Sequence, residues 1–410
     1  MKILLWHGYL LGGTGSNVYT RSLVRVWSRL GHEVVVFCQE PHPERYDLGD
    51  ATVLRPEPDG RLPVFVLDRY EDLEPALLQD LTPGERERFV ERNAAAVRAH
   101  LPADRLFVNH VLLGAPVGAS VEMPFTVKAH GSELEYSLRG NAELVTWARE
   151  TLAHAEEVVA GSEHIREVLA DVVGWTERVR VVPPGVDVDE LQPEPREQAL
   201  LGLLAEAGRD GAPRSERDPD EGNTGRLAGF FADEAPTVVY VGKLSREKGV
   251  PLLLSALASL EAKAVVVGFG PERDELERAA GERVLFTGPL EHRHLRHLWP
   301  LADVSVTPSV FPEAFGMVAA EAAACGSPPL VARHSGLATV AAALEAEYPD
   351  RLRTLTSFAP DDADDLAAKL AAILALPREE WEELSAAARR TAVRRWSWER
   401  VAALLLSRHG

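Results

Sequence analysis

The chain has 410 residues, 46% of them hydrophobic, which is enough for about two to three domains with buried cores. Its net charge of −19 argues against a nucleic-acid partner, and no apolar run approaches the roughly 20 residues of a membrane span. The apolar start, residues 1–6, is too short for a signal peptide, and the two cysteines, Cys38 and Cys325, favour a reducing compartment. We therefore expect a cytoplasmic protein without disulfides or a transmembrane segment.

The first half of the chain alternates short apolar runs with helical stretches. Strands are predicted at 2–6, 33–37, 106–109, 125–129, 157–160 and 179–182, and helices at 17–30, 83–100 and 142–155. Alternating helices and fully apolar strands are typical of a parallel, doubly wound sheet.

The second half repeats this pattern. Strands are predicted at 237–241, 264–267, 284–286, 304–307 and 329–332, with a helix at 250–261 and a largely helical tail from 361. The sequence therefore predicts two Rossmann-like α/β domains that face each other, with a ligand in the cleft outside the carboxyl ends of the strands.

A polar segment, residues 206–234, separates the two halves. It is rich in Gly, Pro, Asp, Arg and Ser, so it is expected to bury little apolar surface and to be mobile. It is either an inert insertion or a regulatory or partner-binding element.

Two glutamates, Glu313 and Glu321, flank the start of a predicted helix over 318–324. Pro312 and Gly316 are poor helix-interior residues, so Glu313 is expected in the preceding loop, next to free backbone amides of a helix N-terminus. On one helix the two acids would be about 12 Å apart, more than the roughly 5 to 10 Å of a hydrolytic carboxylate pair. They fit two acids that hold opposite ends of one polar ligand, although Glu321 alone could face solvent.

A glycine-rich turn, residues 12–16, lies between the first strand and the first helix, where glycines let the backbone approach a phosphate. It does not match G-x-G-x-x-G. An NAD-binding interpretation would also need an acid after the second strand, a place that Glu40 could fill.

Basic and imidazole side chains follow other predicted strands. Lys243 and Lys248 surround a strand-to-helix turn and suit a diphosphate, or form a solvated basic turn. His130 follows a strand at the cleft, where it can contact a sugar hydroxyl, or it is a surface histidine. Three further histidines lie on a predicted amphipathic helix without an acid cluster and do not predict a metal site: His292, His294 and His297.

In this order, the motifs resemble those of family 4 glycosyltransferases, retaining nucleotide-sugar enzymes with the GT-B fold. The resemblance covers nearly the whole chain except about 206–234. It rests on Gly12-Gly13 with Asn17-Val-Tyr19, His130-Gly-Ser-Glu133, Val182-Pro-Pro-Gly-Val-Asp187, Gly242-Lys-Leu-Ser-Arg-Glu-Lys-Gly249, Val267-Gly-Phe-Gly-Pro271, Phe286-Thr-Gly288, the Glu313 and Glu321 pair, and Trp396-Ser-Trp-Glu399.

The resemblance implies a division of the chain. It places an acceptor-side Rossmann-like domain at 1–190, a linker with the mobile insertion at 191–235, and a nucleotide-sugar domain at 236–395. A C-terminal helix at 396–410 would cross back to the first domain. Closure of the two domains around the donor is expected.

The resemblance also implies a role for each site residue. Glu321 would bind the ribose, and Glu313 with the amides of Phe315, Gly316 and Met317 would hold the donor sugar. Lys243, Lys248 and the Gly13 backbone would bind the diphosphate, Leu290 would contact the base, and His130 would contact the sugar near the reacting carbon. The family usually has Arg where this chain has Lys243, which removes the bidentate fork.

The resemblance predicts transfer with retention, without a metal or other cofactor, from a nucleotide sugar. UDP is slightly favoured as the nucleotide. The acidic surface favours a soluble small molecule or saccharide as acceptor, bound near 12–19, 109–114 and 130–139. A GT-B fold nucleotide-sugar epimerase or hydrolase and an inactive sugar-nucleotide binding protein are the alternatives.

Overall fold

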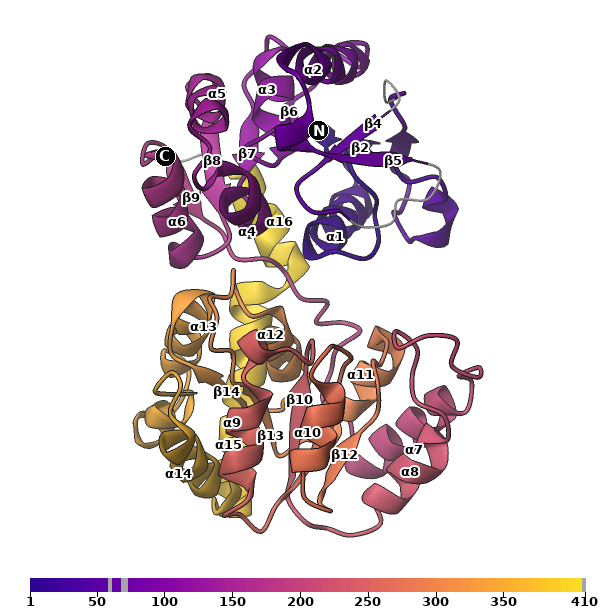
Figure 1. The fold of residues 1–410 in the computed structure, drawn as a ribbon, viewed down its shortest axis with the longest axis vertical. Helices are drawn as coiled ribbons and strands as arrows, with labels where there is room; N and C mark the ends of the chain where they lie inside the picture. The colour runs from indigo at the N-terminus through magenta and orange to yellow at the C-terminus, as the bar shows by residue number, and fades with distance from the viewer. Residues whose placement is uncertain (58–60, 68–72, 408–410) are drawn as a thin grey trace. The chain divides into compact units, whose positions relative to one another are not determined.

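We analysed a computed structural model, which describes residues 1–57, 61–67 and 73–407. The chain forms two compact units, Met1–Gly185 with Trp398–Gly410 and Val186–Ser397 (Figure 1). Each unit has its own parallel sheet, as the sequence predicts. Among the helices that the structure describes, none combines the length and apolar character needed to cross a membrane.

The first unit is built on a seven-stranded parallel sheet with strand order β3-β2-β1-β6-β7-β8-β9, accompanied by a two-stranded parallel sheet of β4 and β5. Its strands are β1 (Lys2–Trp6), β2 (Glu33–Phe37), β3 (Thr52–Leu54), β4 (Arg61–Val64), β5 (Glu74–Leu77), β6 (Arg105–Asn109), β7 (Thr126–Lys128), β8 (Glu157–Ala160) and β9 (Val179–Val181). Its helices are α1 (Gly15–Arg29), α2 (Pro83–Arg98), α3 (Gly114–Ala119), α4 (Gly131–Glu133), α5 (Ala142–Leu152), α6 (Glu163–Val173) and α16 (Trp398–Leu406).

Strand β1 shows why the strands of this sheet are apolar throughout. Leu4 and Trp6 belong to the hydrophobic cluster on one face, and Ile3 and Leu5 belong to the cluster on the other. Successive side chains of a strand point to opposite faces, so a sheet covered on both faces needs apolar residues at every position. All four side chains are at most 1% exposed.

Helix α16 is part of the first unit although it is last in the sequence. Trp27 of α1 donates its indole N–H to the carbonyl of Ala402 at 3.3 Å, and Arg180 donates to the carbonyl of Leu404 at 2.7 Å. The chain leaves the unit at Gly185, where a Cβ would lie 2.3 Å from the ring of Trp398. Glycine therefore allows the departing and returning segments to pack closely.

The second unit has a six-stranded parallel sheet with strand order β12-β11-β10-β13-β14-β15. Its strands are β10 (Thr237–Val241), β11 (Lys263–Val267), β12 (Val284–Phe286), β13 (Val304–Thr307), β14 (Pro329–Ala332) and β15 (Ser357–Phe358). Its helices are α7 (Arg196–Ala207), α8 (Asn223–Phe230), α9 (Val250–Leu257), α10 (Arg273–Ala279), α11 (His292–Leu298), α12 (Met317–Ala324), α13 (Ser335–Glu345), α14 (Ala363–Leu374) and α15 (Arg378–Thr391).

Each sheet has a switch point, where the strand order reverses direction. In the first unit it lies between β1 and β6, and in the second between β10 and β13. Ligands of doubly wound sheets bind outside the carboxyl ends of the strands at such points. The loops after these four strands are therefore where a site is expected in each unit.

Residues 206–234, for which the composition predicts a mobile insertion, contain helical structure and ion pairs. They include the end of α7 and all of α8, and α7 packs against α8 and α11 beside β12 (Figure 1). Charged side chains of this segment form ion pairs with residues far along the chain, including Asp210 with Arg293 and Asp220 with Arg273. Composition shows the charges but not these distant partners, and the mobility of the segment stays a prediction.

Candidate active site

In the second unit, Lys248 and Glu313 meet at the switch point. Lys248 ends a short 3₁₀ turn, Arg246–Lys248, after β10, and Glu313 lies in the loop after β13. The Lys248 ammonium donates to Glu313 Oε1 at 2.5 Å, and the Ser309 hydroxyl donates to the same oxygen at 2.8 Å. Lys243 is exposed earlier in the same loop after β10, and its carbonyl accepts from the Tyr240 hydroxyl at 2.9 Å.

Backbone contacts hold this turn against the loop that carries Glu313. The Glu247 carbonyl accepts from the N–H groups of Val310 at 2.9 Å and Phe311 at 3.2 Å. Gly249 has φ +67°, and a Cβ there would lie 1.9 Å from the Pro308 carbonyl oxygen. Only glycine fits this close approach, so the two loops are fixed to each other before any ligand arrives.

Helix α12 begins directly after this loop. Its N-cap is Gly316, whose φ of +116° strains any residue other than glycine and whose Cβ position lies 2.6 Å from the Leu337 side chain. The first turn of a helix leaves its N–H groups without intrahelical acceptors and carries the positive end of the helix dipole. Phe315 and Gly316 directly precede this helix and Met317 is its first residue, four residues or fewer from Glu313 in the chain. That their amides hold a donor sugar stays a prediction.

Glu321 lies in the second turn of α12 with its side chain 13% exposed. This low exposure removes the alternative of a solvent-facing carboxylate. Its Oε1 is 3.4 Å from Nε2 of His292, the first residue of α11. Leu290, two residues earlier, is buried in the loop between β12 and α11. The structure therefore brings the predicted ribose residue and the predicted base loop close together.

The three histidines of α11 have separate carboxylate neighbours. His294 faces Asp210 at 3.1 Å and His297 faces Glu194 at 2.8 Å, while His292 faces Glu321. In residues 1–57, 61–67 and 73–407, no group of three or more His, Cys, Asp or Glu residues could hold a metal ion.

In the first unit, the glycine turn lies after β1 with one open face. Gly13 has φ +91°, and nothing lies within 4 Å of where its Cβ would be, so a ligand can approach this backbone. The Asn17 side chain holds the turn by donating to the Gly12 carbonyl and by bonding Nε2 of His7 at 2.8 Å. Glu40, which an NAD-binding interpretation requires, instead accepts from the Leu11 N–H at 3.1 Å.

His130 follows β7 and is the N-cap of α4. Its Nε2 bonds Asn109 Oδ1 at 2.9 Å, while the Asn109 amide group donates to the Thr20 hydroxyl at 3.1 Å. Desolvation, with smaller effects of Lys128 and His7, holds the pKa of His130 well below 6.5. The ring is therefore neutral with the Nε2 proton toward Asn109, and its acceptor nitrogen faces the Glu133 backbone N–H in the capping box at the start of α4.

Four polar neighbours of His130 were given no role from the sequence, although Glu133 ends one of the quoted motifs: His7, His110, Lys128 and Glu133. Burial lowers the pKa of Lys128 to about 7 and raises the pKa of Glu133 to about 8. His110 has φ +75°, and its ring nitrogens form no hydrogen bond within the described residues; Nδ1 is 3.7 Å from Glu133 Oε2. A sequence signal did exist, because His7 and His110 directly follow β1 and β6, the strands of the switch point.

Two family models match successive parts of the chain. The model for Glycosyltransferase Family 4 matches residues 13–190, and the model for Glycosyl transferases group 1 matches residues 227–391. The chain belongs to glycosyltransferase family 4.

Relatives of this family 4 chain include two named for one reaction. The D-inositol 3-phosphate glycosyltransferase of Xylanimonas cellulosilytica is 33% identical over 272 residues, covering 61% of this chain but only 57% of that protein. D-inositol 3-phosphate glycosyltransferase 1 of Catenulispora acidiphila is 28% identical, covering 79% of this chain and 76% of that protein. The match to the first relative thus spans less than two thirds of its length.

A solved structure shows the fold of this family 4 chain. HepE of Anabaena, solved in complex with UDP, matches with a TM-score of 0.69 at 18% identity, covering 99% of this chain and 98% of that one. This likeness identifies the two-unit architecture as the GT-B fold, which the sequence motifs predict.

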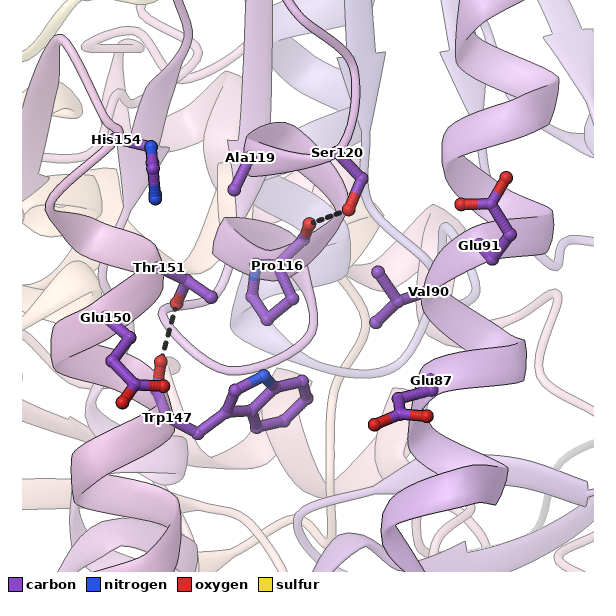
Figure 2. Close-up of a pocket in the computed structure, with 10 residues that line it drawn as sticks. All are labelled: Glu87, Val90, Glu91, Pro116, Ala119, Ser120, Trp147, Glu150, Thr151 and His154. Carbon is purple, nitrogen blue, oxygen red and sulfur yellow. Dashed lines mark hydrogen bonds between the residues drawn. The ribbon is translucent and has the colours of Figure 1, made fainter.

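The first unit also contains a pocket of about 420 Å³ away from the predicted site residues (Figure 2). Three helices supply most of its lining, with Glu87 and Glu91 on α2, Pro116 on α3, and Trp147 and Glu150 on α5. None of the residues predicted for catalysis or for donor binding lines it. It is therefore a separate feature of the helical layer.

Proposed function

We propose that this family 4 chain is a retaining glycosyltransferase that moves a sugar from a nucleotide sugar to a small soluble acceptor without a metal ion. The observation that carries the proposal is the Lys248–Glu313 pair beside the start of α12. It combines a cation for a diphosphate with a carboxylate and free amides for sugar hydroxyls, at the switch point of a doubly wound sheet.

The donor would bind the second unit through groups of opposite character. Lys243 and Lys248, helped by the Gly13 backbone, would offset the diphosphate charge and stabilise it as a leaving group. Glu313 and the amides of residues 315–317 would hold the sugar. Glu321 would accept from the ribose hydroxyls, and Leu290 would contact the base. Two lysines and a helix N-terminus together supply positive charge, so the proposed reaction needs no metal.

The proposed reaction is front-face attack. The acceptor oxygen forms its bond to the anomeric carbon on the face from which the diphosphate leaves, and the acceptor proton passes to the departing phosphate oxygen. Neutral His130 would contact the sugar near the reacting carbon, which positions the sugar without adding charge. Front-face attack retains the anomeric configuration and needs no second carboxylate as nucleophile.

UDP is the first nucleotide to test because HepE, a neighbour in fold, was solved with UDP and with UDP-glucose. An inositol phosphate is the first acceptor to test because two relatives are named for D-inositol 3-phosphate. Both remain proposals for this chain.

The test measures UDP release from several UDP-sugars with and without D-inositol 3-phosphate, inositol or sugar phosphates, in buffer containing EDTA. Release that depends on the acceptor and survives EDTA supports a metal-independent transferase, and NMR of the product's anomeric proton decides retention. Release without any acceptor indicates an epimerase or hydrolase. Nucleotide binding without turnover of any donor and acceptor indicates a binding protein.

A further inference from the structure

A segment between the two family matches is built onto the proposed donor site. Residues 206–223, which we call the linker segment, lie between the match that ends at 190 and the match that starts at 227. The segment is nevertheless fixed to the second unit at three places. All three adjoin loops after β11 and β12, on the same side of the switch point as Leu290.

The first attachment lies just after the base loop, residues 287–291. The Arg293 guanidinium donates to the Glu206 carbonyl at 3.0 Å and pairs with the Asp210 carboxylate. The other Asp210 oxygen lies 3.1 Å from Nε2 of the fully buried His294. Because Arg293 and His294 are the second and third residues of α11, these contacts fix the end of the base loop.

The second attachment lies at the beginning of the same loop. The Asp220 N–H and the Asn223 side-chain amide both donate to the Thr287 carbonyl, each at 2.9 Å. The Asp220 carboxylate takes a bidentate contact from Arg273, at 2.8 and 2.5 Å. A Cβ on Gly288 would lie 2.6 Å from Asp220 Oδ1, so the segment packs directly on the loop. The loop that carries Leu290 is therefore held at both ends by residues outside the matched regions.

The third contact brings a charged side chain to the neighbouring loop. The exposed Arg217 guanidinium lies over the Phe269 ring, 5.7 Å from its centroid. Phe269 follows β11, and its carbonyl accepts from the Leu244 N–H at 2.8 Å in the loop that carries Lys243. The Gly268 N–H donates to the Gly288 carbonyl at 3.0 Å, which joins the Phe269 loop to the base loop.

We propose that the linker segment sets the nucleobase selectivity of the donor site, with Arg217 as its specificity-determining residue and Asp220 as a positioning residue. This inference rests on the proposed function, because it concerns the nucleotide of that same donor. A guanidinium has only N–H donors, so it favours a base edge with carbonyl oxygens, such as uracil, over the edge of adenine with its amino group. The segment thereby selects UDP over ADP.

Calorimetric titration of the full-length protein with UDP, ADP and pyrophosphate tests this role. For Arg217→Ala we expect UDP binding to weaken by about tenfold, as for loss of one charge-assisted hydrogen bond, with ADP and pyrophosphate within about twofold of wild type. The matched control is Glu216→Ala, which changes the exposed neighbouring side chain and should change none of the three affinities. An unchanged ratio of UDP to ADP affinity in Arg217→Ala overturns the proposal, as does equal weakening of all three ligands.

Asp220→Asn tests the positioning role separately, with circular dichroism as the check of folding. Weaker binding of UDP and ADP with unchanged binding of pyrophosphate is expected, because only the base loop loses its support. If pyrophosphate binding weakens as much as UDP binding, Asp220 has a general structural role, and its proposed role in positioning the base loop is overturned. If wild-type protein binds none of the three ligands, the proposed function fails and this inference with it. If wild type binds UDP and Arg217→Ala leaves its selectivity intact, the inference alone fails.

Discussion

The carboxyl ends of the strands carry polar residues in both units, but under opposite conditions. In the first unit, His7, His110 and Glu133 are at most 1% exposed. Burial lowers the pKa values of the two histidines and raises the pKa of Glu133, so the neutral form of each is favoured. In the second unit, Lys248 and Glu313 are partly exposed, and the two form an ion pair.

The difference matches two kinds of ligand. A buried neutral set can exchange hydrogen bonds with hydroxyl groups and positions them without attracting ions. Partly exposed charged side chains lose less hydration when they form an ion pair, and the lysine can exchange its internal partner for a diphosphate. The four predictions below test this contrast between a neutral set and a charged set, beginning with the largest expected effect.

Lys248→Ala should have the largest effect on activity. It removes the cation that pairs with Glu313, and with it much of the positive charge available to the leaving diphosphate. We expect kcat/KM to fall by about 1,000-fold, near 4 kcal/mol, as for other groups that stabilise developing charge. Arg246→Ala, an exposed cation of the same turn, is the control and should lose less than about threefold. Equal losses in the two variants would show that only the general positive field of the turn matters.

Acid should destabilise the first unit through its buried histidines. Burial lowers the pKa of His7 from 6.5 to about 4. Between these values the unfolded chain binds a proton at this position and the folded chain does not, so stability is present above pH 6.5 and is lost as the pH falls toward 4. For His7 the full loss is on the order of 3 kcal/mol.

Denaturant titrations at pH 7, 6 and 5 measure this loss. His7→Asn should flatten the pH dependence, whereas His42→Asn, which changes a partly exposed histidine, should leave it unchanged. The raised pKa of Glu133, about 8, gives a contribution to stability with the opposite pH dependence. This contribution is the same in wild type and in both variants, so it does not affect the comparison. An identical slope in wild type and His7→Asn would contradict the neutral character of this set.

His130→Ala should lower kcat by about 100-fold, near 2.7 kcal/mol, because the sugar loses a contact that positions it at the reacting carbon. The pH profile separates this role from a purely structural one. Because the pKa of His130 lies well below 6.5, wild-type kcat should show no titration of this residue between pH 6.5 and 8. A loss of activity below a pKa near 6.5 that disappears in His130→Ala would show a ring that titrates in solution, against this assignment.

Apolar runs made much of the fold predictable. The strands at 2–6, 33–37 and 157–160 have the bounds that the sequence predicts, because buried parallel strands are apolar at every position. The loop position of Glu313 and the helical position of Glu321 were also predictable from Pro312 and Gly316. The helix predicted at 250–261 ends earlier, at Leu257.

Other parts of the fold depend on tertiary partners that sequence patterns do not reveal. Strands β4 and β5 each contain a proline, Pro63 and Pro75, and a proline in a sequence argues against a strand because it lacks the backbone N–H. His110 is buried by contacts with residues of β7 and α4, which lie further along the chain, so its burial could not be predicted from the residues next to it in the sequence. The composition of the linker segment predicts mobility because it does not show that its carboxylates pair with Arg273 and Arg293, which come close only when the chain folds.

Glu321→Gln should have the smallest effect, because it weakens only the hydrogen bonds to the two neutral ribose hydroxyls. The charged side chains proposed to bind the diphosphate are unchanged. We expect UDP binding to weaken by about tenfold, or 1.4 kcal/mol, while pyrophosphate binding is unchanged. The ribose role is tested with dUDP, which lacks the 2′-hydroxyl. Wild type should bind dUDP less tightly than UDP, and Glu321→Gln should bind the two more equally. If the variant keeps the full preference for UDP, Glu321 does not bind the ribose. Its contact with His292 would then be structural, and the start of α11 would be the place to look for the ribose partner.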